Sequence, residues 1–216
     1  MKAIRSVSVV FSLVSVFMFS CDKNDVPTAG VDVVTTATVK DLMADTILGI
    51  AVTGQPYGSG KYTLYSLERN AVVSSADSAS NKWDIGFRGT TIITNSGNSG
   101  PGAGGAFVFT GLFDDLKTIP SDSIFRVDNA PASFAIPSGS NKGWYVYNAP
   151  VNLVTAIPGR VLVIRTGTGK YAKVEILNYY RGGVTPASTA SEDDKLRKQR
   201  FYTFRFAYQP NGSLKF

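Results

Sequence analysis

Hydrophobic and polar positions alternate along several stretches of the chain, and the clearest alternation begins at Trp83. Trp83, Ile85 and Phe87 are apolar, and polar or small residues stand between them. A period of two predicts a β-strand with one buried face, so we expect Trp83 in the core. Gly89 interrupts the pattern, and the β-branched run 90–94 then predicts a second strand after a tight corner.

A glycine-rich loop follows this pair of strands. Residues 95–105 contain five glycines and Pro101, a composition that excludes a helix or a central strand. A phosphate-binding loop would need Gly-Lys-Ser/Thr at the start of a helix. The run 106–109 that follows is strand-like and contains no lysine. The sequence therefore favours a structural corner between strands.

The second half of the chain predicts further strands. Residues 161–165 and 171–180 form a hairpin pattern, and Gly167, Thr168 and Gly169 are expected to supply its turn and the positive φ angles. The alternating aromatic run 201–208 predicts the last strand. Lys173 and Glu175 fall on one face of the hairpin, which we expect to be solvated.

The remaining segments carry weaker patterns. Residues 39–52 suit a first strand or a short helix, and 111–117 is the best candidate for a short helical turn. The polar stretch 181–194 predicts a weakly ordered excursion. With ten tyrosines and thirteen phenylalanines, the composition favours strands. We therefore predict one all-β domain over 39–216.

The start of the chain resembles an export signal. Residues 1–20 have a basic beginning and an apolar stretch that is too short to span a bilayer as a helix. Cys21, the chain's single cysteine, follows directly, so we expect it to be the lipid-bearing residue of a bacterial lipoprotein. Residues 21–38 would then form the anchor and tether. The alternative is a cleaved signal with an incidental cysteine.

Charge and residue usage exclude several functions. The net charge of +6 is scattered, so the concentrated basic face of a nucleic-acid-binding protein is missing and we expect no nucleic-acid partner. There is no histidine, which removes Ser-His-Asp catalysis and histidine-based zinc sites. The adjacent carboxylates at 114–115 and 193–194 suit solvated surface better than a facing catalytic pair. We therefore interpret the chain as a non-enzyme.

Three blocks of the sequence carry a family resemblance. The pattern WDIGFRG…TNSG…SGPGAGGA from Trp83, the block RVLVIRTGTGKYAKVEILNYY over 160–180 and the run YTFRFAYQP over 202–210 resemble the HmuY-like family of haem-binding surface lipoproteins, in that family's order. The resemblance implies an all-β fold that grips haem between finger-like strands. It also implies a role in haem and iron acquisition, an outer-membrane location at the cell surface and an outer-membrane receptor as a further partner.

The resemblance does not carry over the family's iron ligands. The best-known members ligate iron with two histidines, and relatives use methionines. One ligand position falls near Asn148 and Ala149, and the other in the shortened segment 127–140, which has neither His nor Met. Tyr145 and Tyr147 lie nearest the first position, although aromatic packing is the more frequent role for such residues.

Methionine offers a further candidate ligand. Met43 is the one methionine after Cys21, and its soft thioether is able to hold iron, although an apolar methionine is more often a core residue. Two functional hypotheses follow. The first is a haem- or tetrapyrrole-binding surface lipoprotein without histidine ligands. The second is a surface interaction module of the same fold that binds another small ligand, a glycan or a protein.

Overall fold

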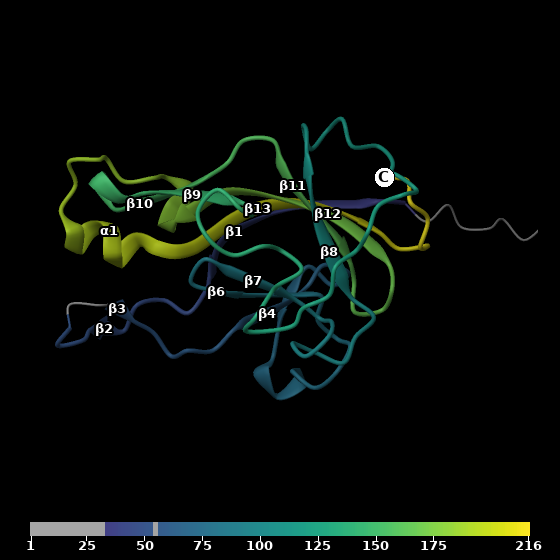
Figure 1. Cartoon of the computed structure of the whole chain (residues 1–216), viewed down its shortest axis with the longest axis horizontal. Helices are drawn as coiled ribbons and strands as arrows, with labels where there is room; N and C mark the ends of the chain where they lie inside the picture. The colour runs from purple at the N-terminus through teal and green to yellow at the C-terminus, as the bar shows by residue number, and fades with distance from the viewer. Residues whose placement is uncertain (1–32, 54–55) are drawn as a thin grey trace, which may run out of the picture. The chain divides into compact units, whose positions relative to one another are not determined.

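Antiparallel strands dominate the computed structural model, which describes residues 33–53 and 56–216 (Figure 1). The expected all-β class is confirmed. The proposed signal segment 1–20 and the proposed lipid site Cys21 lie outside the described residues. Within the described ranges, no helix has the length and apolarity needed to cross a membrane.

Two sheets form the body of this part of the chain. The five-stranded sheet has the order β1 (Thr35–Met43), β13 (Gln199–Gln209), β12 (Tyr171–Tyr180), β11 (Arg160–Arg165) and β8 (Gly105–Thr110). The four-stranded sheet has the order β5 (Ala71–Val73), β4 (Thr63–Ser66), β6 (Ile85–Arg88) and β7 (Thr91–Thr94). Residues 39–52 thus begin as a strand, and that strand starts at Thr35, within the segment assigned to the tether.

Two short hairpins and one α-helix complete the described elements. The hairpins are β2 (Gly49–Ile50) with β3 (Pro56–Tyr57) and β9 (Tyr145–Asn148) with β10 (Leu153–Ala156). The helix is α1 (Glu192–Lys198), and the single 3-10 turns are η1 (Ser75–Asp77), η2 (Ala149–Val151) and η3 (Arg181–Gly183). In Figure 1 both hairpins and α1 lie at one end of the five-stranded sheet.

Aromatic side chains fill the space between the two sheets. Phe87 of β6 stacks on Phe204 of β13 with ring centroids 5.5 Å apart, and it meets Tyr202 at 4.8 Å. Tyr65 of β4 meets the edge of Phe204 at 5.6 Å. The alternation predicted over 201–208 is confirmed, because Tyr202, Phe204, Phe206 and Tyr208 are all buried in this one cluster. Such pairs add about 0.5–1.5 kcal/mol each beyond their area burial.

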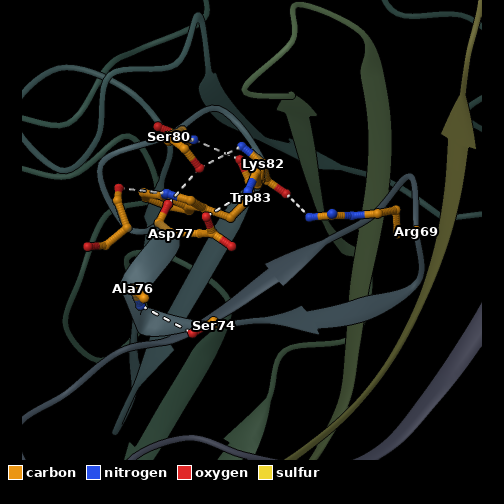
Figure 2. Close-up of polar contacts among 9 residues, drawn as sticks. Arg69, Ser74, Ala76, Asp77, Ser80, Lys82 and Trp83 are labelled. Atoms are coloured by element: carbon orange, nitrogen blue, oxygen red, sulfur yellow. Dashed lines mark hydrogen bonds and ion pairs between the residues drawn. The ribbon is translucent and has the colours of Figure 1, made fainter.

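Trp83 is fully buried, as the sequence predicts, but outside the main cluster. It precedes β6 and packs with Leu64 and Ile93 of the four-stranded sheet, in a cluster separate from the one between the two sheets. Its indole N–H donates to the carbonyl of Ser78 at 3.0 Å, in the turn around η1 shown in Figure 2. The expectation of one solvated face is wrong here, because Asp84 is also buried.

The glycine-rich loop is a structural corner, as expected, and it wraps the side chain of Asn95. The Asn95 amide donates to the carbonyl of Trp83 at 2.8 Å, and its oxygen accepts from the backbone N–H of Gly102 at 2.8 Å. A Cβ at Gly102 would lie 2.8 Å from the Asn95 side chain. Glycine is therefore required here for close approach of the backbone.

The prediction that Lys173 lies on a solvated face of the hairpin is wrong. Its side chain is buried, and its amine donates to the carbonyls of Phe113 at 2.7 Å and Leu116 at 2.8 Å. Segment 111–117, expected to be a helical turn, is a non-helical turn that covers this face. In the hairpin turn Gly169 has a φ of 80°, whereas Gly167 does not have positive φ.

The prediction of weak order over 181–194 is wrong at its end, because α1 begins at Glu192. Ser191 caps it by accepting from the N–H of Asp194 at 3.2 Å. Ion pairs one turn apart, Asp193 with Arg197 and Asp194 with Lys198, line its exposed side. Acidic residues in the first turn and basic residues in the last also suit the helix dipole. These features stabilise a helix that lacks an apolar stripe.

Candidate functional site

The β9–β10 hairpin positions both tyrosines that the sequence singled out. Tyr145 pairs with Ala156 and Tyr147 with Val154 across the hairpin. The hairpin is fixed to the five-stranded sheet, because the Tyr180 hydroxyl of β12 accepts from the Val154 backbone N–H at 2.8 Å. Tyr145 and Tyr147 stand two positions apart on β9, so they fall on the same side of the strand.

Tyr145 sits in the aromatic core. Only 8% of the residue is exposed, and its ring lies 4.9 Å from that of Trp144. The Thr90 hydroxyl donates to the Tyr145 oxygen at 3.3 Å. Tyr145 therefore packs in the core, which is the alternative to iron ligation named in the sequence analysis.

Tyr147 faces a pocket. It is 44% exposed and contributes to a cavity of about 460 Å³, which we call the Tyr147 pocket. The pocket is lined by Pro56, Tyr147, Asn152, Glu192, Lys195, Leu196 and Gln199. It therefore lies where the β9–β10 hairpin, α1 and β3 come together, among the elements grouped at one end of Figure 1.

A chain of hydrogen bonds organises the polar wall of the Tyr147 pocket. The Tyr147 hydroxyl donates to Asn152 Oδ1 at 2.6 Å, and Asn152 Nδ2 donates to Glu192 Oε2 at 2.9 Å. Lys195 Nζ donates to Glu192 Oε1 at 2.9 Å. The bonds from Lys195 and then Asn152 lower the pKa of Glu192. Lys195 is buried, so the pocket contains one desolvated cation with a carboxylate partner.

Apolar side chains lie around this end of the molecule. Leu196 lines the Tyr147 pocket on one side of α1 and a smaller cavity of about 230 Å³ against Leu48 and Ile50 on the other. The β2–β3 hairpin exposes large apolar residues, namely Leu48, Ile50, Val52 and Tyr57. A ligand with an apolar body would therefore meet apolar surface beside the pocket.

Met43 lies apart from the lining of the Tyr147 pocket. It pairs with Phe201 at the end of β1, and 56% of the residue is exposed. Phe201 stands two positions along β13 from Gln199, which does line the pocket. The structure thus brings Tyr147 into the pocket, buries Tyr145 and leaves Met43 on the surface.

Of the residues that line the pocket, Tyr147 alone was singled out from the sequence. Asn152, Glu192 and Lys195, which form the polar wall, come from separate segments, and Asn152 and Glu192 stand 40 positions apart. Asn152 directly precedes β10 and has a φ of 51°. An asparagine between two strands is typical of such a positive-φ position, and this is the sequence signal that could have drawn attention to it. Among the described residues, no three acidic, histidine or cysteine side chains gather as a metal site.

Comparison with solved structures finds the same fold in bacterial proteins. A candidate lipoprotein of Bacteroides fragilis is 12% identical, with a TM-score of 0.50 over 82% of this chain and 92% of that one. The apo HmuY analogue of Tannerella forsythia is 15% identical, with a TM-score of 0.45 over 83% and 97%. A candidate HmuY-like haem-binding protein of Bacteroides vulgatus is 15% identical, with a TM-score of 0.45 over 82% and 93%.

Comparison with protein families identifies the chain itself. A search of curated proteins finds no match. Residues 59–191 match the model of the family described as HmuY protein. This match runs through both sheets, the β9–β10 hairpin and the segment that leads into α1. Because it covers more than half of the 216 residues, the chain belongs to the HmuY family.

Proposed function

We propose that this chain is a haem-binding surface lipoprotein that takes up haem without histidine ligands, and that the Tyr147 pocket is its binding site. Membership of the HmuY family supports the ligand class. The observation that carries the site is Tyr147, a partly exposed residue that lines a cavity of about 460 Å³. The proposal makes the chain a binding protein and not an enzyme.

The pocket suits part of a flat apolar ligand. Small-ligand sites are commonly about 300–1,000 Å³ and combine apolar walls with a few placed polar groups. Here Pro56 and Leu196 supply apolar wall, and the exposed β2–β3 hairpin extends it. Burial of a porphyrin face contributes roughly 25 cal/mol per Å². The Lys195 amine offers a charge-assisted hydrogen bond to a propionate that competes with Glu192.

Tyr147 is the best-placed iron ligand among the three candidates. Tyr147 lines the pocket and its hydroxyl is bonded to Asn152, which also lines it, whereas Tyr145 is buried in the core. The Tyr147 hydroxyl donates a hydrogen bond to Asn152 Oδ1, which fixes the ring's orientation. A phenol oxygen prefers ferric iron, so this ligation would weaken on reduction. Apolar burial would remain and would supply the rest of the affinity.

Hemin titration, followed by the Soret band, tests the proposal. We expect saturable binding by the parent and weaker binding by Tyr147→Phe, with the difference confined to the oxidised state. Tyr145→Phe is the matched control, since it removes the same oxygen from a buried position. Met43→Leu tests the thioether while keeping apolar volume.

The outcomes separate the parts of the proposal. Absence of saturable binding by the parent would remove the haem function and favour an interaction module that binds another small ligand, a glycan or a protein. Equal hemin affinity in the parent and Tyr147→Phe would remove Tyr147 as the ligand. A loss confined to Met43→Leu would move ligation to the surface of β1.

The location of the protein forms part of the same proposal. A lipid on Cys21 would attach the chain to the outer membrane, and the tether would place the β-domain at the cell surface. An outer-membrane receptor would then accept the haem. Family membership and the position of Cys21 after an apolar leader support this arrangement.

A further inference from the structure

A second pocket lies at the edge of the five-stranded sheet, beside its outermost strand β8. Its volume is about 410 Å³. It is lined by residues of β8, the start of β11 and the segment between β8 and β9, among them Val108, Ile124, Arg126, Pro137, Lys142 and Arg160. We call it the edge pocket. It shares no lining residue with the Tyr147 pocket.

Positive charge converges on the edge pocket. Arg126, Lys142 and Arg160 line it, and no acidic residue does. In the part of the chain that the structure describes, none of these three cations forms an ion pair. Three unneutralised cations around one cavity attract an anion, and the two guanidinium groups suit carboxylate or phosphate oxygens.

The backbone of β8 adds a hydrogen-bond donor to the edge pocket. Ala106 exchanges both of its backbone hydrogen bonds with Arg126, each at 2.9 Å, so its N–H points away from β11. In an antiparallel ladder this direction recurs every second residue, so the N–H of Val108 points the same way. No described residue accepts a hydrogen bond from it there. An anionic oxygen in the pocket would satisfy this donor.

The rest of the edge pocket is apolar. Ile124, which lines the pocket, is 80% exposed, and Pro137 and Phe107 contribute further apolar wall. An inorganic anion would leave this surface in water. A ligand that joins an anionic head to an apolar body would cover the isoleucine and bring its charge among the cations.

We propose that the edge pocket is a second binding site, separate from the haem site proposed at the Tyr147 pocket, for a small amphipathic anion. The anionic head, a carboxylate or a phosphate, lies among Arg126, Lys142 and Arg160 and accepts from the N–H of Val108. The apolar body lies against Ile124. This chemistry is shared by fatty acids and phosphorylated lipids.

Calorimetric titration of the purified protein with laurate and with dodecyl phosphate, each below its micellar concentration, tests the proposal and separates the two sources. We expect one saturable site. Arg160→Gln should weaken binding about tenfold, as for the loss of one charge-assisted hydrogen bond, and Arg160→Lys should retain most of it. Lys142→Gln is a second variant, whose exposed side chain is unconnected to the fold's core.

Matched controls make each result decisive. Lys61→Gln removes an exposed charge that does not line the pocket and should leave the affinity unchanged. Tyr147→Phe should also bind both probes normally. Equal affinity in the parent, Arg160→Gln and Lys142→Gln would overturn the proposal, as would the absence of saturable binding. Stoichiometric displacement of the probes by hemin would overturn the separation of the two sites.

Discussion

The carboxylate of Asp84 accepts a hydrogen bond from the backbone N–H of Gly167, which lies 3.0 Å away and 83 positions later in the chain. Its other oxygen accepts from the N–H of Leu67 at 2.7 Å. One buried side chain thus joins the end of β4 to the turn between β11 and β12. Asp84 thus connects the four-stranded sheet to the five-stranded sheet.

This carboxylate should make stability depend on pH. Burial raises the pKa of Asp84 from 3.8 to about 6, and the N–H groups of Leu67 and Gly167 oppose that rise. Because the folded pKa exceeds the unfolded one, the folded state binds the proton more tightly. The resulting stability is fully present below about pH 4 and is lost as pH rises through about 6, by roughly 3 kcal/mol for a shift of two units.

Urea unfolding across this pH range measures the effect, and Asp84→Asn is the control. The amide has no charge to titrate, so its stability should not show this dependence. It also leaves one of the two N–H groups without an acceptor, which costs about 1–3 kcal/mol. The same change between pH 4 and 6 in the parent and the variant would show that Asp84 is not responsible.

Trp83→Ala should lower the free energy of unfolding by about 3–5 kcal/mol, because it empties a fully buried position. Trp83→Phe should cost less, since it keeps a ring against Leu64 and Ile93 and loses only part of the volume and the bond to Ser78. Thermal and denaturant unfolding measure both variants. A Trp83→Ala protein as stable as the parent contradicts the assigned packing.

Lys173→Met should destabilise the domain although it replaces a buried cation by an apolar side chain. It leaves the carbonyls of Phe113 and Leu116 without their donor, which costs about 1–3 kcal/mol. The exposed control Lys61→Met should change stability by less than about 0.5 kcal/mol. Equal unfolding midpoints for the two variants would mean that the 111–117 turn does not depend on the amine.

Cys21→Ala should move the protein from the membrane fraction to the soluble fraction, because it removes the proposed site of acylation. Cell fractionation with immunoblotting measures this change. The control is Ser20→Ala, which alters the neighbouring residue and should leave the protein with the membrane. Unchanged fractionation of Cys21→Ala would refute the anchor.

The fold could be predicted where burial follows from local alternation. The strand of Tyr202, Phe204 and Phe206 is an example, because its pattern records the core directly. The pattern misled at Lys173, because the covering residues 111–117 come from a distant segment. It also missed α1, whose stability rests on the Ser191 cap and charge pairs between turns.

The candidate site was only partly predictable. Family resemblance directed attention to Tyr145 and Tyr147, and the chain's alternation does not say which of two residues on one strand face is covered by other elements. Tertiary packing decides it, by burying Tyr145 beside Thr90, which stands 55 positions earlier, and by leaving Tyr147 at the pocket. The contact of Asn152 with Glu192 depends on how the hairpin and α1 meet, which no local pattern records.

The pairing of β1 with β13 has a consequence for when the chain can fold during its synthesis. Thr35 of β1 lies opposite Tyr208 of β13, so the five-stranded sheet cannot be completed until β13 has been synthesised. Contacts of such high sequence separation form slowly, since the chain must first lose the entropy of a long loop. If residues 1–20 direct export, a nascent chain that lacks β13 would still lack its completed five-stranded sheet when export begins.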